Sequence, residues 1–389
     1  MSRIVLKAGT VLCGPELELM ANGAVIVEDG KIQDVVPQGQ LEHVEGEEID
    51  LGALTLMPGM IECHNHLCID ATIPDHLELL AGATACELTV LAQSGLIADL
   101  MSGVTTARCM ADLYDIDISM KKLIEEGKVT GPRLLVSGVG IKGSHGAGYI
   151  GFPHCGVEEV RRTVRQNLKK GVDLIKLFIT PGVPDPNSDF VPSFLSPEEI
   201  RVAVEEAKRK GISVSAHCIG GQGLIDCIEN GVSIIEHVYM ITDEEVKRLE
   251  ASDCIVDLTS GIMLDPSREA YLSEANAKKV RLNRERVRRN VARVINSKVP
   301  YILGTDAYHG FLYRECEYAV ELGADNRTAV KAVTSFAAKA LNQSQKIGSI
   351  QSGLLADLIA VDGNPLQDIH VLSQVNFVMK DGRVFKNRC

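Results

Sequence analysis

The chain has no tryptophan among its 389 residues, and aromatic residues make up only 4% of it. Few aromatic side chains mean few stacking surfaces, which disfavours a large aromatic substrate. No apolar run is long enough to span a membrane, and the first seven residues lack the apolar core of a signal peptide. The 52 acidic residues outnumber the 40 basic ones, so no basic surplus exists to neutralise nucleic-acid phosphates. We therefore expect neither a membrane nor a nucleic acid as a partner.

Paired cysteines are also missing. The 11 cysteines are an odd number, and none of them stands in a CxxC pair. Scattered cysteines of this kind are typical of a reducing compartment. The composition thus predicts a cytoplasmic protein. A homo-oligomer is compatible with this composition, but no segment of the sequence marks a subunit interface.

The two ends of the chain share a pattern of short alternating strands and tight turns. Asp29-Gly30 separates two apolar stretches near the N-terminus, and Asp381-Gly382 does the same near the C-terminus. Asp-Gly between two such stretches is a strong signal for a β-hairpin. We therefore predict one small β-sandwich domain built from both termini, residues 1–56 plus 347–389. The long segment between them, 57–346, forms a second domain.

This middle segment alternates apolar strands with amphipathic helices. A strand that ends at His64 is followed by seven buried parallel strands, at 103–110, 133–141, 173–180, 213–218, 233–238, 254–259 and 301–305. Helix signals lie between them, such as Ser196-Pro-Glu-Glu199, which joins a capping residue to a first-turn proline. Eight β-then-α units predict an α/β fold, the (β/α)8 TIM barrel. Its catalytic groups are expected at the C-terminal ends of the strands.

Candidate metal ligands stand at those strand ends. His64 and His66 are two residues apart, so an extended strand points both imidazoles to the same side. Further candidates follow on the fourth, fifth, sixth and eighth strands: Lys176, His217, His237 and Asp306. Imidazole and carboxylate suit zinc and similar divalent ions. Each residue alone also fits a structural role, as a strand histidine, a helix cap or a lysine paired with an acid. Their regular placement favours a metal centre.

With these residues, the chain resembles the amidohydrolase superfamily of metal-dependent hydrolases over nearly its whole length. The matching motifs are Pro58-Gly-Met-Ile-Glu-Cys-His64-Asn-His66, Gly304-Thr-Asp306 and the segment from Ile347 to Pro365. Lys176 and the loop Lys142-Gly-Ser-His145-Gly are most similar to the imidazolonepropionase-like branch, which includes Xaa-Pro and Xaa-Arg dipeptidases. The resemblance implies two divalent metal ions, with zinc the first expectation. His64, His66 and Asp306 would hold one ion, His217 and His237 the other, and N6-carboxylated Lys176 would bridge them.

The resemblance also implies a reaction. The two ions would lower the pKa of a shared water, and Asp306 would take its proton and pass it to the leaving nitrogen. The expected function is a binuclear metal-dependent hydrolase that cleaves a C–N amide bond in a small peptide-like substrate, of the dipeptidase or N-acyl amino acid hydrolase type. The alternative is a mononuclear deaminase or a cyclic-amide (imidazolone-type) ring-opening hydrolase, in which Lys176 stays unmodified and His237 assists catalysis. A non-catalytic scaffold on the same fold is a third hypothesis.

Three further residues are candidate substrate contacts. By resemblance, His145 in its glycine-rich loop 143–151 would bind the substrate carbonyl or stabilise the oxyanion. Tyr239 follows His237 by two residues, which directs its hydroxyl towards a substrate carboxylate. Arg314, expected on a loop at the barrel mouth, suits bidentate binding of a carboxylate. Each of the three also fits a structural role, as a loop, packing or surface residue.

Overall fold

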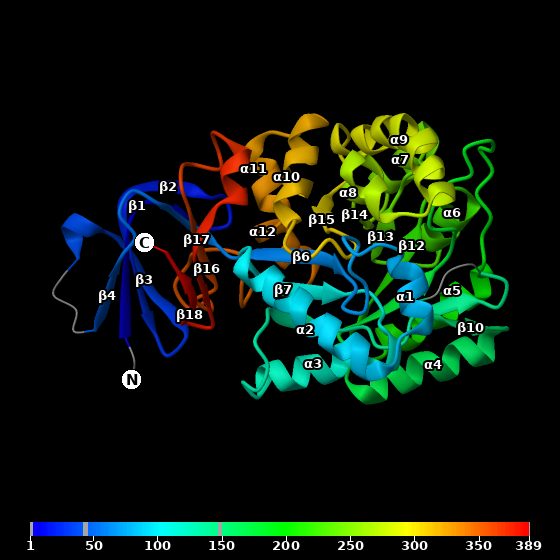
Figure 1. The fold of residues 1–389 in the computed structure, drawn as a ribbon, viewed down its shortest axis with the longest axis horizontal. Coiled ribbons are helices and arrows are strands. Elements are labelled where there is room, and N and C mark those ends of the chain that lie inside the picture. Colours follow the sequence, from blue (N-terminus) through cyan, green and yellow to red (C-terminus); the bar gives the residue numbers. More distant parts are fainter. Residues whose placement is uncertain (1–2, 42–45, 147–149, 389) are drawn as a thin grey trace. The chain divides into compact units, whose positions relative to one another are not determined.

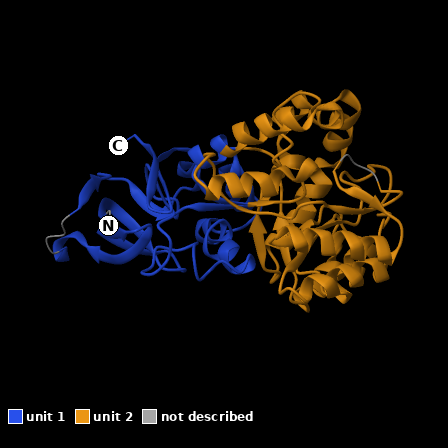
Figure 2. Ribbon diagram, turned by 90° about the horizontal axis from the view of Figure 1, so that it is seen from below, with its two compact units in different colours: residues 1–62, 97–107, 310–389 blue, residues 63–96, 108–309 orange. Residues whose placement is uncertain are grey.

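Two compact units share the chain in the computed structural model, which describes residues 3–41, 46–146 and 150–388. We call residues 1–62, 97–107 and 310–389 the terminal unit, and residues 63–96 and 108–309 the barrel unit (Figure 2). These units are groups of residues that pack compactly together, and they do not test where a domain begins or ends. The predicted domain limits at 57 and 346 therefore stay a prediction.

Strands from both chain ends pair in one eight-stranded sheet in the terminal unit. Its order is β18-β17-β16-β5-β1-β2-β3, with β4 beside β1. The strands are β1 (Arg3–Cys13), β2 (Glu18–Glu28), β3 (Lys31–Pro37), β4 (Glu47–Asp50), β5 (Thr55–Pro58), β16 (Leu358–Val361), β17 (Val375–Lys380) and β18 (Arg383–Asn387). Buried side chains from these strands form a single hydrophobic cluster. The predicted β domain drawn from both termini is confirmed.

Both predicted hairpins of this sheet are present. Asp29 and Gly30 have φ values of 48° and 81°, and Asp381 and Gly382 have 51° and 72°. Two consecutive positive φ values are the mark of a type I′ turn, which asparagine, aspartate and glycine tolerate best. Helices α10 (Leu312–Glu321), α11 (Asn326–Ala332) and α12 (Ser335–Ala340) also belong to the terminal unit.

The barrel has the eight predicted parallel strands. They are β6 (Met60–Asn65), β7 (Val104–Cys109), β8 (Arg133–Leu135), β11 (Leu174–Phe178), β12 (Ser213–Cys218), β13 (Ile234–His237), β14 (Ile255–Leu258) and β15 (Tyr301–Leu303) (Figure 1). Strands β6, β7 and β8 form one sheet, and β11 to β15 belong to a second sheet. Backbone hydrogen bonds join these two sheets at both edges. Asp173 N donates to Val136 O at 2.7 Å beside β8, and Asp306 N donates to His64 O at 2.8 Å beside β6. The fold class, a TIM barrel with a β domain, is confirmed.

Helices alternate with these strands in the chain. They are α1 (His76–Gly82), α2 (Ala85–Met101), α3 (Ile116–Glu125), α4 (Val157–Lys170), α5 (Pro197–Lys208), α6 (Gln222–Glu229), α7 (Asp243–Glu250), α8 (Gly261–Leu264) and α9 (Glu274–Ile295). Helix α5 begins with the predicted cap, because Ser196 and Glu199 form a reciprocal capping box. No helix in the described part of the chain has both the length and the apolar character needed to cross a membrane.

One predicted strand is wrong in its centre. The segment 133–141 was expected to be continuous, but β8 ends at Leu135 and a separate short strand, β9 (Ile141–Gly143), begins six residues later and pairs with β10 (Phe152–His154) and β11. The side chain of Asp117 explains the break. Its carboxylate accepts the backbone N–H groups of Ser137 and Gly138, which a continuous strand would give to a ladder.

Candidate metal centre

The predicted ligands lie at the C-terminal ends of the barrel strands, within the barrel unit. The imidazole rings of His64 and His237 are 4.8 Å apart between centroids, and those of His217 and His237 are 4.4 Å apart. Asp306 Oδ1 lies 3.5 Å from Nε2 of His64 and 3.4 Å from Nε2 of His66. Residues separated by more than 200 positions in the chain therefore meet at one place.

Two of these ligands have a backbone conformation that side chains rarely adopt. His237 has φ 81° and Asp306 has φ 56°, and the residue after each also has a positive φ. A left-handed conformation costs on the order of 1–3 kcal/mol at a residue other than glycine, and it persists where the surrounding structure enforces it. At the end of β13 it lets Glu236 and His237 both face the barrel interior, although neighbouring strand residues normally face opposite sides.

Each of the four histidines uses one ring nitrogen to bind a group outside the centre. The pairs are His64 Nδ1 with Glu236 Oε2 at 2.8 Å, His66 Nδ1 with Ala111 O at 2.9 Å, His217 Nε2 with Pro181 O at 3.0 Å and His237 Nδ1 with Thr259 Oγ1 at 2.7 Å. Histidines that bind a metal usually have such a partner, because it fixes the tautomer and the ring orientation. The second nitrogen of each ring is thus left to act as the ligand.

Burial keeps three of these histidines, His64, His217 and His237, neutral, which is the form that binds a metal ion. Desolvation, followed by the nearby charge of Lys176, lowers the pKa of His64 to about 3 and that of His217 to about 4. Desolvation also holds the pKa of His237 well below its usual value. Burial alone would raise the pKa of Asp306, but its interactions with His64, His66 and His237, which include a hydrogen bond with His66, hold it well below its usual value.

Lys176 is fully buried in β11, and its Nζ has no hydrogen-bond partner among the described residues. Desolvation lowers its pKa from 10.5 to about 8, against the raising effect of Glu236 and Asp306. A buried cation without a partner is rare, because burial costs it the hydration that it has in water. As a bridging carboxylate, the same side chain would instead contribute two ligand oxygens. His64, His237 and Asp306 form a donor set that fits a divalent metal ion.

Comparison with known proteins agrees with this donor set. The family model for the amidohydrolase family matches residues 55–385. The chain belongs to the amidohydrolase family. It is therefore an enzyme, a hydrolase that acts on C–N bonds, and metal binding is general in its family.

Known members support the predicted branch. The chain is 31% identical to ochratoxinase from Aspergillus niger, over 98% of this chain and 86% of that protein. It is 26% identical to imidazolonepropionase from Geobacillus sp. (strain WCH70), over 95% of this chain and 91% of that protein. A solved structure of a Xaa-Pro dipeptidase with bound methionine in the active site has a TM-score of 0.87 and 27% identity, and the match covers 99% of this chain and 100% of that chain.

This amidohydrolase carries a buried ion network that the sequence reasoning missed. Arg108 in β7 contacts Glu236 in β13 at 3.0 Å and Asp257 in β14 at 2.7 Å, and all three are at most 2% exposed. Charged residues are almost never fully buried unless they are paired. The signal was therefore available in the sequence: one charged residue stands inside each of three apolar strands.

The three predicted substrate contacts differ in their surroundings, and their roles stay predictions. Tyr239 is buried, and its hydroxyl donates to Thr259 O at 2.9 Å. His145 is exposed and lies edge-on to the Phe194 ring at 5.4 Å, while residues 147–149 of its predicted loop lie outside the described part of the chain. Arg314 belongs to the terminal unit and lies within α10, so its predicted position on a loop is wrong. Its guanidinium lies 3.6 Å from Glu317 and against the Tyr318 ring.

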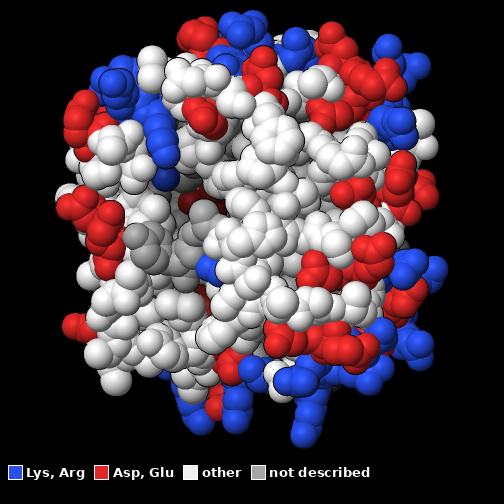
Figure 3. Space-filling view, turned by 90° about the vertical axis from the view of Figure 1, so that its right-hand side faces the viewer, with Lys and Arg blue, Asp and Glu red and all other residues white. Residues whose placement is uncertain are grey.

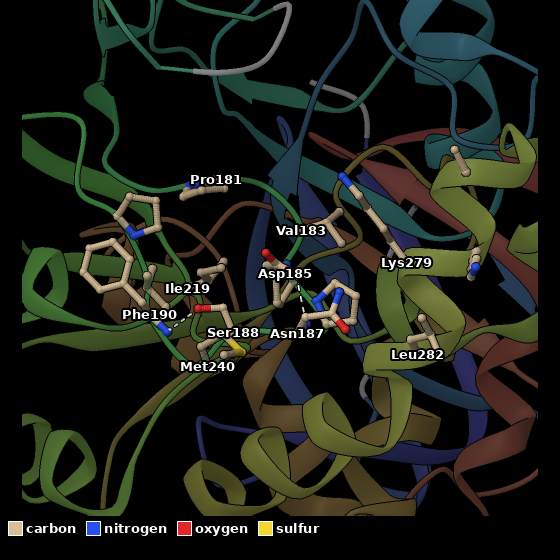
Figure 4. Close-up of a pocket in the computed structure, with 16 residues that line it drawn as sticks. Pro181, Val183, Asp185, Asn187, Ser188, Phe190, Ile219, Met240, Lys279 and Leu282 are labelled. Atoms are coloured by element: carbon tan, nitrogen blue, oxygen red, sulfur yellow. Dashed lines mark hydrogen bonds between the residues drawn. The ribbon is translucent and has the colours of Figure 1, made fainter.

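A cavity of about 600 Å³ lies next to the centre in the barrel unit. The loop after β11 forms one wall and α9 forms another, and Figure 4 shows Phe190, Ile219 and Met240 on one side and Leu282 on the other. Pro181 links the cavity to the centre, since it lines the cavity and accepts the hydrogen bond of His217.

Polar residues that line the cavity include Asp185, Lys278 and Lys279, and all three are exposed. On the face of the molecule drawn in Figure 3, charged side chains likewise gather near the rim, and mostly uncharged atoms surround a central hollow. An apolar wall with a few polar groups is typical of a small-molecule site.

Proposed function

We propose that this protein is a binuclear metal-dependent amidohydrolase that cleaves a C–N amide bond in a small peptide-like substrate. A dipeptidase or an N-acyl amino acid hydrolase is the favoured type, with two divalent ions, preferably zinc, and N6-carboxylated Lys176 as the bridging ligand. One observation carries the proposal. Four histidines are each anchored through one ring nitrogen, and three of them, His64, His217 and His237, lie within the electrostatic reach of buried Lys176, whose Nζ has no hydrogen-bond partner among the described residues.

When bound, the ions would supply Lewis acidity that activates a water and polarises the scissile carbonyl. The chain's own contribution is the handling of protons. Asp306 keeps 24% of its side-chain surface exposed, whereas His64 keeps 1% and His66 keeps 5%. Its carboxylate thus reaches both the buried centre and the entering substrate. Asp306 Oδ1 takes the proton of the attacking water and delivers it to the leaving nitrogen, because an amine leaves poorly without a proton.

The neighbouring cavity supports a substrate with an apolar part. Ile219 follows the strand of His217, and Met240 follows the strand of His237, so a molecule in the cavity lies beside both metal ligands. We propose that the cavity holds the apolar side group next to the scissile bond. The lysines on α9 then lie near the edge, where a carboxylate of the substrate would remain partly hydrated.

A reducing compartment remains part of the proposal. The ten cysteines that the structure describes are all free thiols. Buried thiols such as Cys109 and Cys316 pack as small apolar side chains and form no crosslink. This supports a cytoplasmic location.

The proposal is tested by metal content and turnover measured on the same sample. Protein purified with zinc and bicarbonate is expected to hold about two ions per chain and to hydrolyse members of a panel of dipeptides and N-acyl amino acids. Chelation should abolish turnover, and zinc should restore it. One ion per chain without bicarbonate dependence, together with turnover of cyclic amides or amines, would favour the mononuclear alternative. Absence of both metal and turnover would contradict the enzymatic proposal.

A further inference from the structure

A fully buried carboxylate lies behind one metal ligand. Glu236 Oε2 accepts the Nδ1–H of His64 at 2.8 Å, and both residues are at most 1% exposed. The bond leaves Nε2 of His64 on the side of Asp306, 3.5 Å from its Oδ1. Rotation of the imidazole would break this hydrogen bond. Glu236 therefore fixes both the tautomer and the orientation of His64.

Glu236 is itself held in place by Arg108. The Nη2 atom of Arg108 lies 3.0 Å from each carboxylate oxygen of Glu236. Arg108 in turn is fixed on three further sides, by Cys63 O, by Ser215 Oγ at 2.7 Å and by Asp257 Oδ2 at 2.7 Å. Residues on five barrel strands, β6, β7, β12, β13 and β14, thus hold the carboxylate of Glu236, and this carboxylate binds one predicted metal ligand, His64.

Stability alone is a poor reason for this network. Buried ion pairs often contribute no net stability, since desolvation of the charges offsets their attraction, and apolar replacements of similar volume are often neutral or stabilising. The other three histidines are anchored by neutral groups, namely the carbonyls of Ala111 and Pro181 and the hydroxyl of Thr259. Of the four, His64 alone is anchored by a carboxylate. A carboxylate partner raises the basicity of the imidazole as a ligand.

We propose that Glu236, oriented by Arg108, is a positioning residue for the metal ion held by His64 and His66. The inference rests on the proposed binuclear centre. It also makes the two metal positions unequal. The position of His64 and His66 depends on Glu236, whereas the position of His217 and His237 depends on Thr259.

Zinc titration of the apo protein, with competition by a chelator, tests the proposal. Glu236→Gln keeps an acceptor oxygen but removes the charge, and it is expected to weaken one of the two zinc ions about 10- to 100-fold while the other keeps its affinity. Thr259→Val is expected to weaken the ion that Glu236→Gln retains. The double variant should then weaken both. A general loss of structure would instead affect both ions in each single variant.

Glu206→Gln is the matched control. It removes the charge of another buried carboxylate, one that pairs with Arg161 and Arg165 and has no contact with a predicted metal ligand, so zinc affinity should stay within about threefold of wild type. If Glu236→Gln fails to fold, Glu236→Gln combined with Arg108→Met and Asp257→Asn removes all three buried charges of the network and should show the same selective loss.

The outcomes separate this inference from the proposed function. Wild-type zinc affinity in Glu236→Gln, an equal loss of both ions, or the same loss in Glu206→Gln would overturn the positioning role while the binuclear centre stands. Wild-type protein that binds no zinc would overturn both.

Discussion

His64 and Asp306 approach each other in two places. The backbone N–H of Asp306 donates to the carbonyl of His64 at 2.8 Å, and the Asp306 carboxylate lies 3.5 Å from Nε2 of the same histidine. The hydrogen bond closes the barrel between its first and eighth strands. The second approach brings a predicted metal ligand next to the proposed base. The contact that closes the barrel between β6 and β15 therefore also brings two residues of the candidate site together.

This closure depends on a glycine. A Cβ on Gly304 would lie 2.5 Å from the backbone nitrogen and the Cβ of His64, closer than real Cβ atoms approach. Gly304→Ala is therefore expected to cost about 1–3 kcal/mol of unfolding free energy, as overpacking does, and to reduce bound zinc. Denaturant unfolding and metal analysis measure the two effects.

Gly82→Ala is the control for Gly304→Ala. Gly82 ends α1, and a Cβ there would meet no atom within 4 Å. Alanine should be neutral or slightly stabilising at this position. Equal stability and equal zinc content in the two variants would show that the close approach at Gly304 is unimportant.

Much of the fold was predictable because periodicity and turn chemistry are local signals. The eight barrel strands, the Asp-Gly hairpins and the cap at Ser196 follow from neighbouring residues in the chain. The break after Leu135 was not predictable, since its cause is the side chain of Asp117 on another element. The Asp117 carboxylate takes up N–H groups that a neighbouring strand would otherwise bind. Because Asp117 lies on another element, the apolar pattern of the strand itself does not show the break.

The residues of the candidate site were also predictable from local signals, but the partners that hold them were not. A histidine or an acid at a strand end is visible in the sequence, and the barrel rule brings such ends together. The partners behind the ligands were missed, because strand alternation puts Glu236 and His237 on opposite faces. Only the left-handed backbone at His237 turns both inward. That conformation is set by packing and has no sequence signal here.

Lys176 offers a test in which stability and function change in opposite directions. Its buried Nζ has no hydrogen-bond partner among the described residues, so Lys176→Met should stabilise the apo protein without bicarbonate, by an amount on the order of 3 kcal/mol, the equivalent of its pKa shift. Zinc content and turnover should fall sharply. Lys121→Met is the contrasting control, because Lys121 pairs with Asp173 at 2.7 Å. That variant should keep its zinc and gain no stability. Destabilisation by Lys176→Met would argue against a strained lysine.

The lowered pKa of Lys176 predicts how carboxylation depends on pH. Only the neutral amine reacts with carbon dioxide, and burial lowers the pKa from 10.5 to about 8. At a fixed concentration of dissolved carbon dioxide, activation of the apo protein by zinc should accelerate about tenfold per pH unit up to about 8 and then level off. An ordinary lysine would continue to accelerate to above pH 10. A flat profile, or activation without any added carbon dioxide source, would contradict the bridge.

The lowered pKa of Lys176 also predicts how the stability of the metal-free protein depends on pH. Between about pH 8 and 10.5 the unfolded chain holds a proton on Lys176 that the folded chain has lost. The free energy of unfolding of the decarboxylated protein should therefore rise with pH across this window, and Lys176→Met should lack that rise. Denaturant titrations at several pH values, compared between the two proteins, measure the difference.

The cavity beside His217 predicts a change in substrate binding. Leu282 on α9 lines it and is 58% exposed, so Leu282→Glu should be tolerated by the fold while it adds a charge to the apolar wall. We expect KM for substrates with an apolar side group to rise about 5- to 30-fold, with little change in kcat. Val90→Glu, at a 71% exposed site on α2 that does not line the cavity, should leave KM unchanged. A similar KM in both variants would place the substrate elsewhere.

Asp306→Asn isolates the proton transfer from the architecture of the site. Asparagine keeps the size of the side chain and leaves the backbone bond to His64 in place, but it cannot take a proton from the attacking water. We expect kcat to fall about 10²- to 10⁴-fold, with KM within a few-fold of wild type, because the lost interaction acts in the transition state. Zinc content must be measured on the same sample, since Asp306 Oδ1 also lies 3.4 Å from His66 Nε2 at the metal position. A variant that retains both ions and turns over within tenfold of wild type would remove Asp306 from the proton path, and the base would have to be sought among the other groups that face the substrate.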